Sequence, residues 1–275
     1  MTLTVKSAVE YPLEVLCGVI NRSFVGYVGG EVNFAPRLLA GFLTQNGIGL
    51  VRSLVVLRDD EPAGIALLAR RGASIRVGLM GITQAAQSQG VGRWLLGEIE
   101  REARDSGDRT MTLEVIEQNP RAVHLYESYG YRRMRRLLGW TGSSLTGEPA
   151  ALVSVDVAEA ARKITAWGSP NLPWQCSGET VITAGPPSAA YRLGSAYAVI
   201  SSPSAETITI SGLAVPPESQ RQGTATRLVG ALITAHPGKA WRVPAICPEE
   251  YGPIFERSGM TRSAVNQFQM EKLVG

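Results

Sequence analysis

The feature that most constrains this chain is a short glycine-containing stretch that occurs twice. The sequence reads Q-S-Q-G-V-G at 87–92 and Q-R-Q-G-T-A at 220–225, and each copy stands directly before a run with helical periodicity. A single glycine turn ahead of a helix is common, but its return in the same setting indicates a duplicated unit. A chain of 275 residues is long enough for two domains of ordinary size.

The elements around the two stretches follow the same order. In each half, a pair of strands leads into the glycine stretch, and a helix, a further strand and a short helical segment come after it. The short helix of the first half is expected to begin at Pro120, with Asn119 as its N-cap. The sequence therefore predicts an α/β fold of the α+β type, with a mixed sheet in each of two tandem domains. We expect a first domain at 1–140, a polar linker at 141–150 and a second domain at 151–275.

Composition argues against several function classes. The net charge is only +3, and the arginines of Y-R-R-M-R-R at 131–136 are expected to be solvated side chains of a strand, with a surface for an acidic ligand as the alternative. No nucleic-acid partner is expected. Cys17, Cys176, Cys247 and the two histidines lack the spacing of metal ligands, so no metal site is expected. The N-terminal residues lack the apolar core of a signal peptide, and no apolar run has membrane-spanning length. We therefore expect a cytoplasmic protein without a membrane partner.

The glycine stretches favour an anion site without proving one. A strand that ends in a glycine turn and then a helix brings several backbone N–H groups and the positive end of the helix to one place. A purely structural turn is at least as common. The spacing is that of neither a P-loop nor the dinucleotide-binding fingerprint, so the stretch alone does not decide between the two interpretations.

A second stretch in the first half favours the anion site over the purely structural turn. The segment N-P-R-A-V-H-L-Y-E-S-Y-G-Y at 119–131 follows the Gln-x-x-Gly-x-Gly loop about one strand downstream. Together they resemble the GNAT family of acetyl-CoA-dependent N-acetyltransferases. The similarity is greatest over M-T-L-E-V-I-E-Q-N-P-R-A-V-H-L-Y-E-S-Y-G-Y, which resembles the branch that acetylates the N-terminal alanine of a ribosomal protein. The similarity does not extend to the loops that select the acceptor.

The resemblance implies a cofactor site for acetyl-CoA in the first half. The backbone N–H groups of the loop would hold the CoA pyrophosphate, the edge of the preceding strand would pair with the pantetheine arm, and Asn119 would contact the cofactor near the thioester. The loop residues are Gln87, Ser88, Gln89, Gly90, Val91, Gly92 and Arg93, and the strand residues are Met80, Gly81 and Ile82.

Two further side chains match the chemistry of acetyl transfer. An amine must lose its proton to attack a thioester, although an α-amino group has a pKa of roughly 8 and a lysine roughly 10.4. Glu114 is the candidate general base, directly or through water, and Tyr126 is the candidate general acid that protonates the CoA thiolate. Without this context, Glu114 would be interpreted as a solvated strand residue and Tyr126 as a core residue.

The second half keeps the loop and loses this set of residues. A gapless alignment of Gly259 with Gly130 places Phe255 against Tyr126, Pro248 against Asn119 and Val243 against Glu114. Pro253 is expected to shorten the helix, and Tyr251 is a weak substitute for the missing phenol. We therefore expect a catalytically degenerate domain with a possible second CoA loop, made of Val215, Gln220, Arg221, Gln222, Gly223, Thr224 and Ala225.

Three functions remain open at this stage. The first is an N-acetyltransferase with its active site in the first domain and acetyl-CoA as cosubstrate. The second places catalysis in the second domain and a non-catalytic CoA in the first. The third is an acyl-CoA-binding or sensing protein without turnover. The acceptor would be a small-molecule amine or a peptide N-terminus. Asn21, Tyr27 and Glu31 are candidates for its binding site or ordinary loop residues. The protein would be a monomer or a homodimer.

Overall fold

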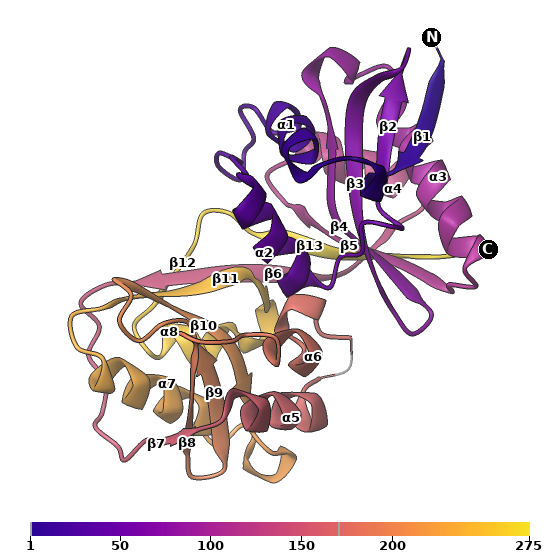
Figure 1. The fold of residues 1–275 in the computed structure, drawn as a ribbon. Helices are drawn as coiled ribbons and strands as arrows, with labels where there is room; N and C mark the ends of the chain where they lie inside the picture. Colours follow the sequence, from indigo (N-terminus) through magenta and orange to yellow (C-terminus); the bar gives the residue numbers. More distant parts are fainter. Residues whose placement is uncertain (1, 170) are drawn as a thin grey trace. The chain divides into compact units, whose positions relative to one another are not determined.

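Two units account for the chain in the computed structural model, which describes residues 2–169 and 171–275. Unit 1 comprises Met1–Met134 and Phe268–Gly275, and unit 2 comprises Arg135–Gln267. These bounds differ from the ranges expected from the sequence. The expected boundary at 140 falls inside strand β6 (Arg132–Gly142), and the last strand, β13 (Gln267–Leu273), lies almost entirely in unit 1 (Figure 1). A break in composition marks a linker, but it does not reveal a strand that returns to an earlier sheet.

The sheet of unit 1 has the strand order β1-β2-β3-β4-β5-β13. Strands β1 to β4 are antiparallel neighbours, whereas β4 and β5 are parallel. Strands β2 and β3 form a hairpin, and its turn places Asp59 and Asp60 at positive φ. The bounds of the first five strands are β1 (Leu3–Ser7), β2 (Leu54–Arg58), β3 (Glu61–Arg71), β4 (Ser74–Ile82) and β5 (Thr110–Ile116).

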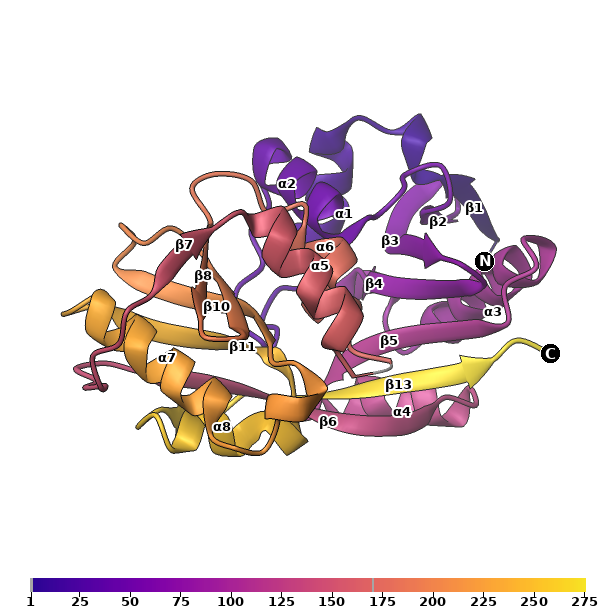
Figure 2. The ribbon, with the colours of Figure 1, turned by 90° about the horizontal axis from the view of Figure 1, so that it is seen from below.

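Helices cover both faces of this sheet (Figure 2). Helix α1 (Leu13–Ser23) packs against β3 on one face together with α2 (Pro36–Asn46). Helices α3 (Val91–Asp105) and α4 (Pro120–Ser128) contribute Leu95, Ile99 and Val123 to the core on the other face. Helix α3 ends before Gly107 and α4 ends before Gly130, and both glycines have positive φ.

Strand β4 carries a bulge that positions the candidate site. Its pairing with β3 shifts between Leu67 and Leu68, which leaves Gly78 as the extra residue. Before the bulge, Ile75 and Val77 face the core beneath α3; after it, Met80 and Ile82 pack against that same core. The parallel pairing with β5 ends at Val77, although both strands continue. The two strands therefore part beside the loop that follows β4.

Unit 2 repeats this plan with its own strands. Its order is β6-β11-β10-β9-β8-β7, and β12 (Thr261–Arg262) also pairs with β6. Strands β10 and β11 are parallel only as far as Thr209 and Arg242, and the pairing of β10 with β9 shifts around Ser211. The bounds are β7 (Val153–Val155), β8 (Ala189–Leu193), β9 (Ala196–Ile200), β10 (Thr207–Ala214) and β11 (Ala240–Pro248).

Local sequence features explain where two helices of unit 2 begin and end. Asp156 caps α5 (Val157–Trp167) by accepting the Ala158 N–H at 2.6 Å. After the short α6 (Gly178–Val181), helix α7 (Thr224–Ala235) follows the second loop, and α8 (Gly252–Glu256) is shorter than α4, as Pro253 predicts. Strand β8 is not predicted by the sequence, because apolar and polar side chains alternate only weakly along its five residues. No helix in the described residues is both long and apolar enough to cross a membrane.

Candidate functional site

The loop after β4 in unit 1 is a turn held by its own glutamines. Gln87 Nε2 donates to the Ile82 carbonyl at 3.0 Å, and Gln89 Nε2 donates to the Ala85 carbonyl at 2.9 Å. Gly90, at φ 79°, precedes the first turn of α3. The N–H groups of a first helical turn have no partner within the helix, and they carry the positive end of its dipole. This geometry suits an anion such as a pyrophosphate.

The two glycines of this loop have different physical roles. Gly90 adopts a left-handed backbone conformation, and nothing lies within 4 Å of where its Cβ would be. Gly92 instead allows close packing, because a Cβ there would lie 3.2 Å from Leu125 Cδ2 and 3.8 Å from Met80 Cε. Close packing against Leu125 and Met80 therefore explains the glycine at 92, independently of any anion.

Two arginines outside the predicted set contact the loop. Arg121 donates to Ser88 Oγ and, at 3.4 Å, to Gln87 Oε1. Arg58 Nη1 donates to Gln89 Oε1 at 3.0 Å and to the Ala85 carbonyl at 2.8 Å. Their guanidinium groups add positive charge beside the helix end. The position of Arg121 after Asn119-Pro120 was a usable signal, whereas Arg58, at the end of β2, is remote in sequence.

Tyr126 lies beside the strand edge, as the first-domain hypothesis requires. Its hydroxyl is 4.0 Å from Met80 Sδ, and its ring centroid is 5.7 Å from that of Tyr131. Burial, with a smaller effect of Tyr27, raises the pKa of Tyr126 well above its ordinary value of 10. The phenol therefore stays protonated at neutral pH, which is the form that donates a proton. Met80 connects the loop and the phenol, because its Cε also approaches Gly92.

Glu114 lies in a buried ion pair rather than on an open strand face. Its Oε2 accepts hydrogen bonds from Arg76 Nη2 at 2.6 Å and Nε at 2.9 Å, and the two side chains are 4% and 3% exposed. Arg76 Nη1 also approaches Asn46 Oδ1 of α2 at 3.5 Å. The carboxylate faces α2, while Tyr126 belongs to the core beneath α3 and α4. An amine cannot contact a carboxylate this deeply buried, so a role as proton acceptor requires an intervening water.

Asn119 acts first as the predicted N-cap. Its side-chain oxygen accepts the Ala122 N–H at 3.2 Å, which fixes the start of α4. Gly81 packs tightly, because a Cβ there would lie 2.7 Å from both Phe24 and Ser23. The predicted cofactor contacts of Asn119 and of the strand edge remain predictions.

The segment after α1 covers the ends of β4 and β5. The Tyr27 ring and the Ile116 side chain both lie against Gly29, where a Cβ would be 2.7 Å and 2.4 Å from them. Of the three acceptor candidates, only Tyr27 approaches the Tyr126 hydroxyl closely enough to affect its pKa. Asn21 instead accepts the Phe34 N–H at 2.8 Å, which holds the segment before α2, and Glu31 is exposed.

The second loop has the same backbone design as the first. Gln220 Nε2 donates to the Val215 carbonyl at 3.0 Å, and Gln222 Nε2 donates to the Glu218 carbonyl at 2.8 Å. Arg221 and Gly223 have φ values of 59° and 76°, close to the 61° and 79° of Ser88 and Gly90. The N-terminal end of α7 is thus presented like that of α3.

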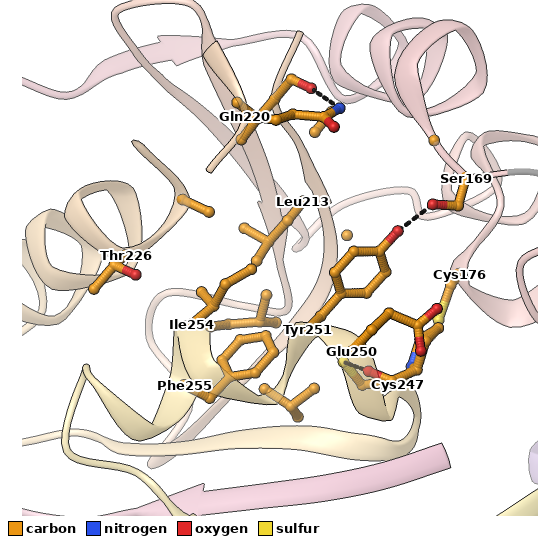
Figure 3. Close-up of a pocket in the computed structure, with 18 of the residues that line it drawn as sticks. Ser169, Cys176, Leu213, Gln220, Thr226, Cys247, Glu250, Tyr251, Ile254 and Phe255 are labelled. Atoms are coloured by element: carbon orange, nitrogen blue, oxygen red, sulfur yellow. Dashed lines mark hydrogen bonds between the residues drawn. The ribbon is translucent and has the colours of Figure 1, made fainter. Parts of the chain in front are cut away.

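In unit 2 this loop borders a cavity of about 620 Å³. Figure 3 shows Gln220 at one end, Tyr251 and Phe255 across the middle, and Cys176 and Cys247 beside Glu250 at the far side. Tyr251 is hydrogen-bonded through its hydroxyl to Ser169 Oγ. The cavity therefore combines a helix end with a lining of both apolar and polar side chains.

Strand pairing corrects one residue of the alignment between the units. Ala240 lies beside Thr207 at the start of β11 as Thr110 lies beside Ser74 at the start of β5. Counted along the strands from these pairs, Pro244 rather than Val243 takes the place of Glu114. Both residues lack a carboxylate, so the correction leaves unit 2 without the candidate base.

The first unit also matches a known family model. Residues 45–145 match the model described as the acetyltransferase (GNAT) domain. By this match, residues 45–145 are similar to a GNAT acetyltransferase domain. The matched stretch contains the β4–α3 loop, Arg76, Glu114 and Tyr126, so the candidate site lies within it. Among the described residues, no group of three or more His, Cys, Asp or Glu side chains is placed to hold a metal.

Comparisons over the whole chain extend the fold to unit 2. A GCN5-related N-acetyltransferase from Sphaerobacter thermophilus superposes with a TM-score of 0.70 at 14% identity, covering 99% of this chain and 96% of that one. A tandem GNAT protein from the clavulanic acid biosynthesis pathway superposes with a TM-score of 0.67 at 13% identity, covering 100% and 99% of the two chains. The fold is therefore that of two tandem GNAT domains.

One curated relative is similar over a short stretch. The mycothiol acetyltransferase of Jonesia denitrificans is 38% identical over 68 residues, which is 25% of this chain and 22% of that protein. The chain thus matches less than a quarter of the length of this relative.

Proposed function

We propose that the protein is an acetyl-CoA-dependent N-acetyltransferase with its active site in unit 1. The observation that carries the proposal is the position of Met80 at the edge of the parting strands. Its Sδ lies 4.0 Å from the Tyr126 hydroxyl, and its Cε lies beside Gly92 at the end of the anion loop. A cofactor held by its pyrophosphate on that loop and by its pantetheine arm on β4 would present its thioester beside this phenol. The GNAT match of residues 45–145 supports the reaction class.

The residues of unit 1 would divide the work as follows. Acetyl-CoA, when bound, supplies the acetyl thioester. Gly90, Arg121 and the first turn of α3 would hold its phosphates, and Asn119 would contact it near the thioester. Glu114 would take a proton from the acceptor amine through a water, since Arg76 and burial keep the carboxylate from direct contact. Tyr126 would give its proton to the departing thiolate.

The acceptor proposed here is a primary amine, either a small molecule or a peptide N-terminus. Tyr27 and Ile116 cover the face of the sheet on which Glu114 lies, so an acceptor must pass this segment to reach the thioester. These side chains are apolar or neutral. They favour an amine carried on an apolar or aromatic group over a polyamine, which would need several carboxylates.

The experiment is an acetyl-transfer assay with acetyl-CoA over a panel of small amines and peptides. The test variants are Tyr126→Phe and Glu114→Gln. Tyr129→Phe is the matched control, because the Tyr129 hydroxyl bonds to Glu100 and lies outside the site. We expect both test variants to lose most turnover and the control to keep it. Unchanged turnover in both test variants would contradict the proposed roles.

A second candidate function is favoured by the cavity of unit 2. The 620 Å³ space bordered by Gln220 and Ala225 is large enough for part of a CoA molecule, and Tyr251 projects into it. In this alternative, unit 2 holds an acyl-CoA, either as a second catalytic site or as a sensor without turnover. Calorimetry with CoA on Gly90→Asp and Gly223→Asp variants distinguishes the two loops. If only Gly223→Asp weakens binding and transfer survives Gly90→Asp, this candidate replaces the first.

A further inference from the structure

Two of the three cysteines lie on one wall of the unit 2 cavity. Cys176 ends the short 3₁₀ helix η3 (Trp174–Cys176), and Cys247 lies near the end of β11. Both thiols line the 620 Å³ cavity, on the same side as Glu250 (Figure 3). The third cysteine, Cys17, is buried in α1 of unit 1. Neither the loop chemistry nor the proposed acetyl transfer uses this pair.

The structure places the thiol of Cys176 against the peptide group that joins Ile246 to Cys247. Cys176 Sγ donates to the Ile246 carbonyl oxygen at 3.3 Å. That carbonyl belongs to the peptide group that Cys247 completes, so the sulfur of Cys176 approaches the same plane that holds the Cys247 Cα atom. Disulfides in proteins have their two Cα atoms about 4.4–6.8 Å apart, so the two residues must be near neighbours in space. The approach of Cys176 Sγ to the carbonyl directly before Cys247, and the place of both residues in the cavity lining, meet this first condition.

The two thiols differ in access and reactivity. Cys247 is 8% exposed, and burial, followed by the effects of Cys176 and Glu250, raises its pKa well above its ordinary value. It therefore stays a thiol at neutral pH and is not the group that begins the exchange. Cys176 is only partly buried, and it lines the 620 Å³ cavity. Cys176 is thus the side chain that reacts first and Cys247 the one that follows.

We propose that Cys176 and Cys247 form an oxidisable dithiol that a low-molecular-weight disulfide converts into an intramolecular disulfide. Cys176, as the thiolate, attacks one sulfur of the small disulfide, whose S–S bond breaks and whose other half leaves as a thiolate. Cys247 then gives up its proton and attacks the Cys176 sulfur, which releases the second half. The two cysteine protons end on the two released thiols. The cysteines are oxidised and the small disulfide is reduced.

The bond would change the cavity as well as the redox state. It would tie η3 to β11 and fix the wall opposite the loop residue Gln220. Disulfides inside cells are mostly transient, so a pair exposed to a cavity suits a reversible modification rather than a permanent structural link. The inference does not depend on which unit catalyses acetyl transfer.

The test uses the full chain, reduced, desalted and treated with 2-hydroxyethyl disulfide. We expect the intact mass to fall by two hydrogens, a Cys176–Cys247 cross-linked peptide after digestion, and full reversal by dithiothreitol. The oxidised protein should unfold at a temperature higher by about 5 °C, because the cross-link closes a long loop in the unfolded chain. A hydroxyethylthio adduct that persists on Cys176 without loss of the two hydrogens would overturn the proposal. So would the absence of any reaction.

Matched variants assign the reaction to this pair. Cys17→Ser should behave as the unmodified sequence does, because Cys17 lies in the other unit. Cys247→Ser should stop at a mixed disulfide on Cys176, and Cys176→Ser should stay unmodified at both remaining cysteines. If Cys247→Ser does not fold, the cross-linked peptide of the unmodified sequence and the Cys176→Ser result decide the question. Cross-linking that survives in Cys176→Ser would contradict the inference.

Discussion

The two loops of this protein show that the same cradle can stand beside different chemistry. Gln87 and Gln220 close their turns onto the preceding strand with equal 3.0 Å hydrogen bonds, and Gly90 and Gly223 share one backbone conformation. Beside the first loop lie a buried phenol and a buried ion pair. Beside the second lies a cavity with Phe255 and Pro244 in the corresponding places. An anion site made of backbone N–H groups tolerates changes in the surrounding side chains. A proton donor is lost when its single side chain is replaced.

The largest expected effect comes from removing the one phenol that distinguishes the units. Tyr126→Phe should lower kcat for acetyl transfer by about 100-fold or more, because general acid catalysis typically contributes that much. The reciprocal change, Phe255→Tyr, should add no activity, since unit 2 has no carboxylate in the place of Glu114. Steady-state kinetics with acetyl-CoA and the best acceptor measures both. Activity gained by Phe255→Tyr would break the contrast between the units.

The ion pair of unit 1 gives the next largest effect. Counted back from the loop glutamines, the place of Arg76 is taken in unit 2 by Thr209, which carries no charge. Arg76→Met should reduce the free energy of unfolding by about 3–5 kcal/mol, because it leaves a buried carboxylate without its cation. The double variant Arg76→Met/Glu114→Leu should recover most of that loss. Urea denaturation measures both; a small effect of the single variant would show that the pair is not buried in solution.

A smaller effect sharpens the difference between Gly92 and its counterpart Ala225. Ala225→Gly should destabilise unit 2 by about 1 kcal/mol, the usual cost of glycine inside a helix. Gly92→Ala should not stabilise unit 1 by the same free energy, because its new methyl group would lie 3.2 Å from Leu125. Thermal unfolding of the two variants side by side measures the asymmetry. Equal and opposite shifts in the unfolding temperature would mean that the Leu125 side chain moves away from the new methyl group without cost.

The smallest effect is a pH dependence confined to unit 2. Burial, then Lys239, lowers the pKa of His236 below its ordinary value of 6.5, and its ring lies between those of Tyr191 and Trp241. The unfolded chain therefore binds this proton more readily than the folded one. The stabilising contribution of neutral His236 is present above pH 6.5 and is lost as the pH falls below it. Unfolding measured between pH 7.5 and 5.5 should show a shallower decline in His236→Phe than in the unmodified sequence.

The sequence predicted the elements well and the positions of side chains less well. The N-caps Asn119 and Asp156 and the shortening by Pro253 follow from local chemistry, so they were available from the sequence. The bulges at Gly78 and Ser211 were not, because alternation alone places Met80 on the wrong face of its strand. The partner of Glu114 was also missed, since Arg76 and Glu114 meet only through the pairing of β4 with β5.

The return of β13 to unit 1 has a consequence for how this protein is made. Met270 lies in the core beneath α3, Lys272 Nζ contacts Glu100 Oε1 at 2.6 Å, and the Val274 N–H donates to the Arg109 carbonyl at 2.9 Å. During synthesis, the first unit stays without its last strand until all of the second has left the ribosome. The candidate catalytic unit therefore begins folding first and finishes last, and a chain cut at residue 140 would leave the open edge of β5 exposed to aggregation.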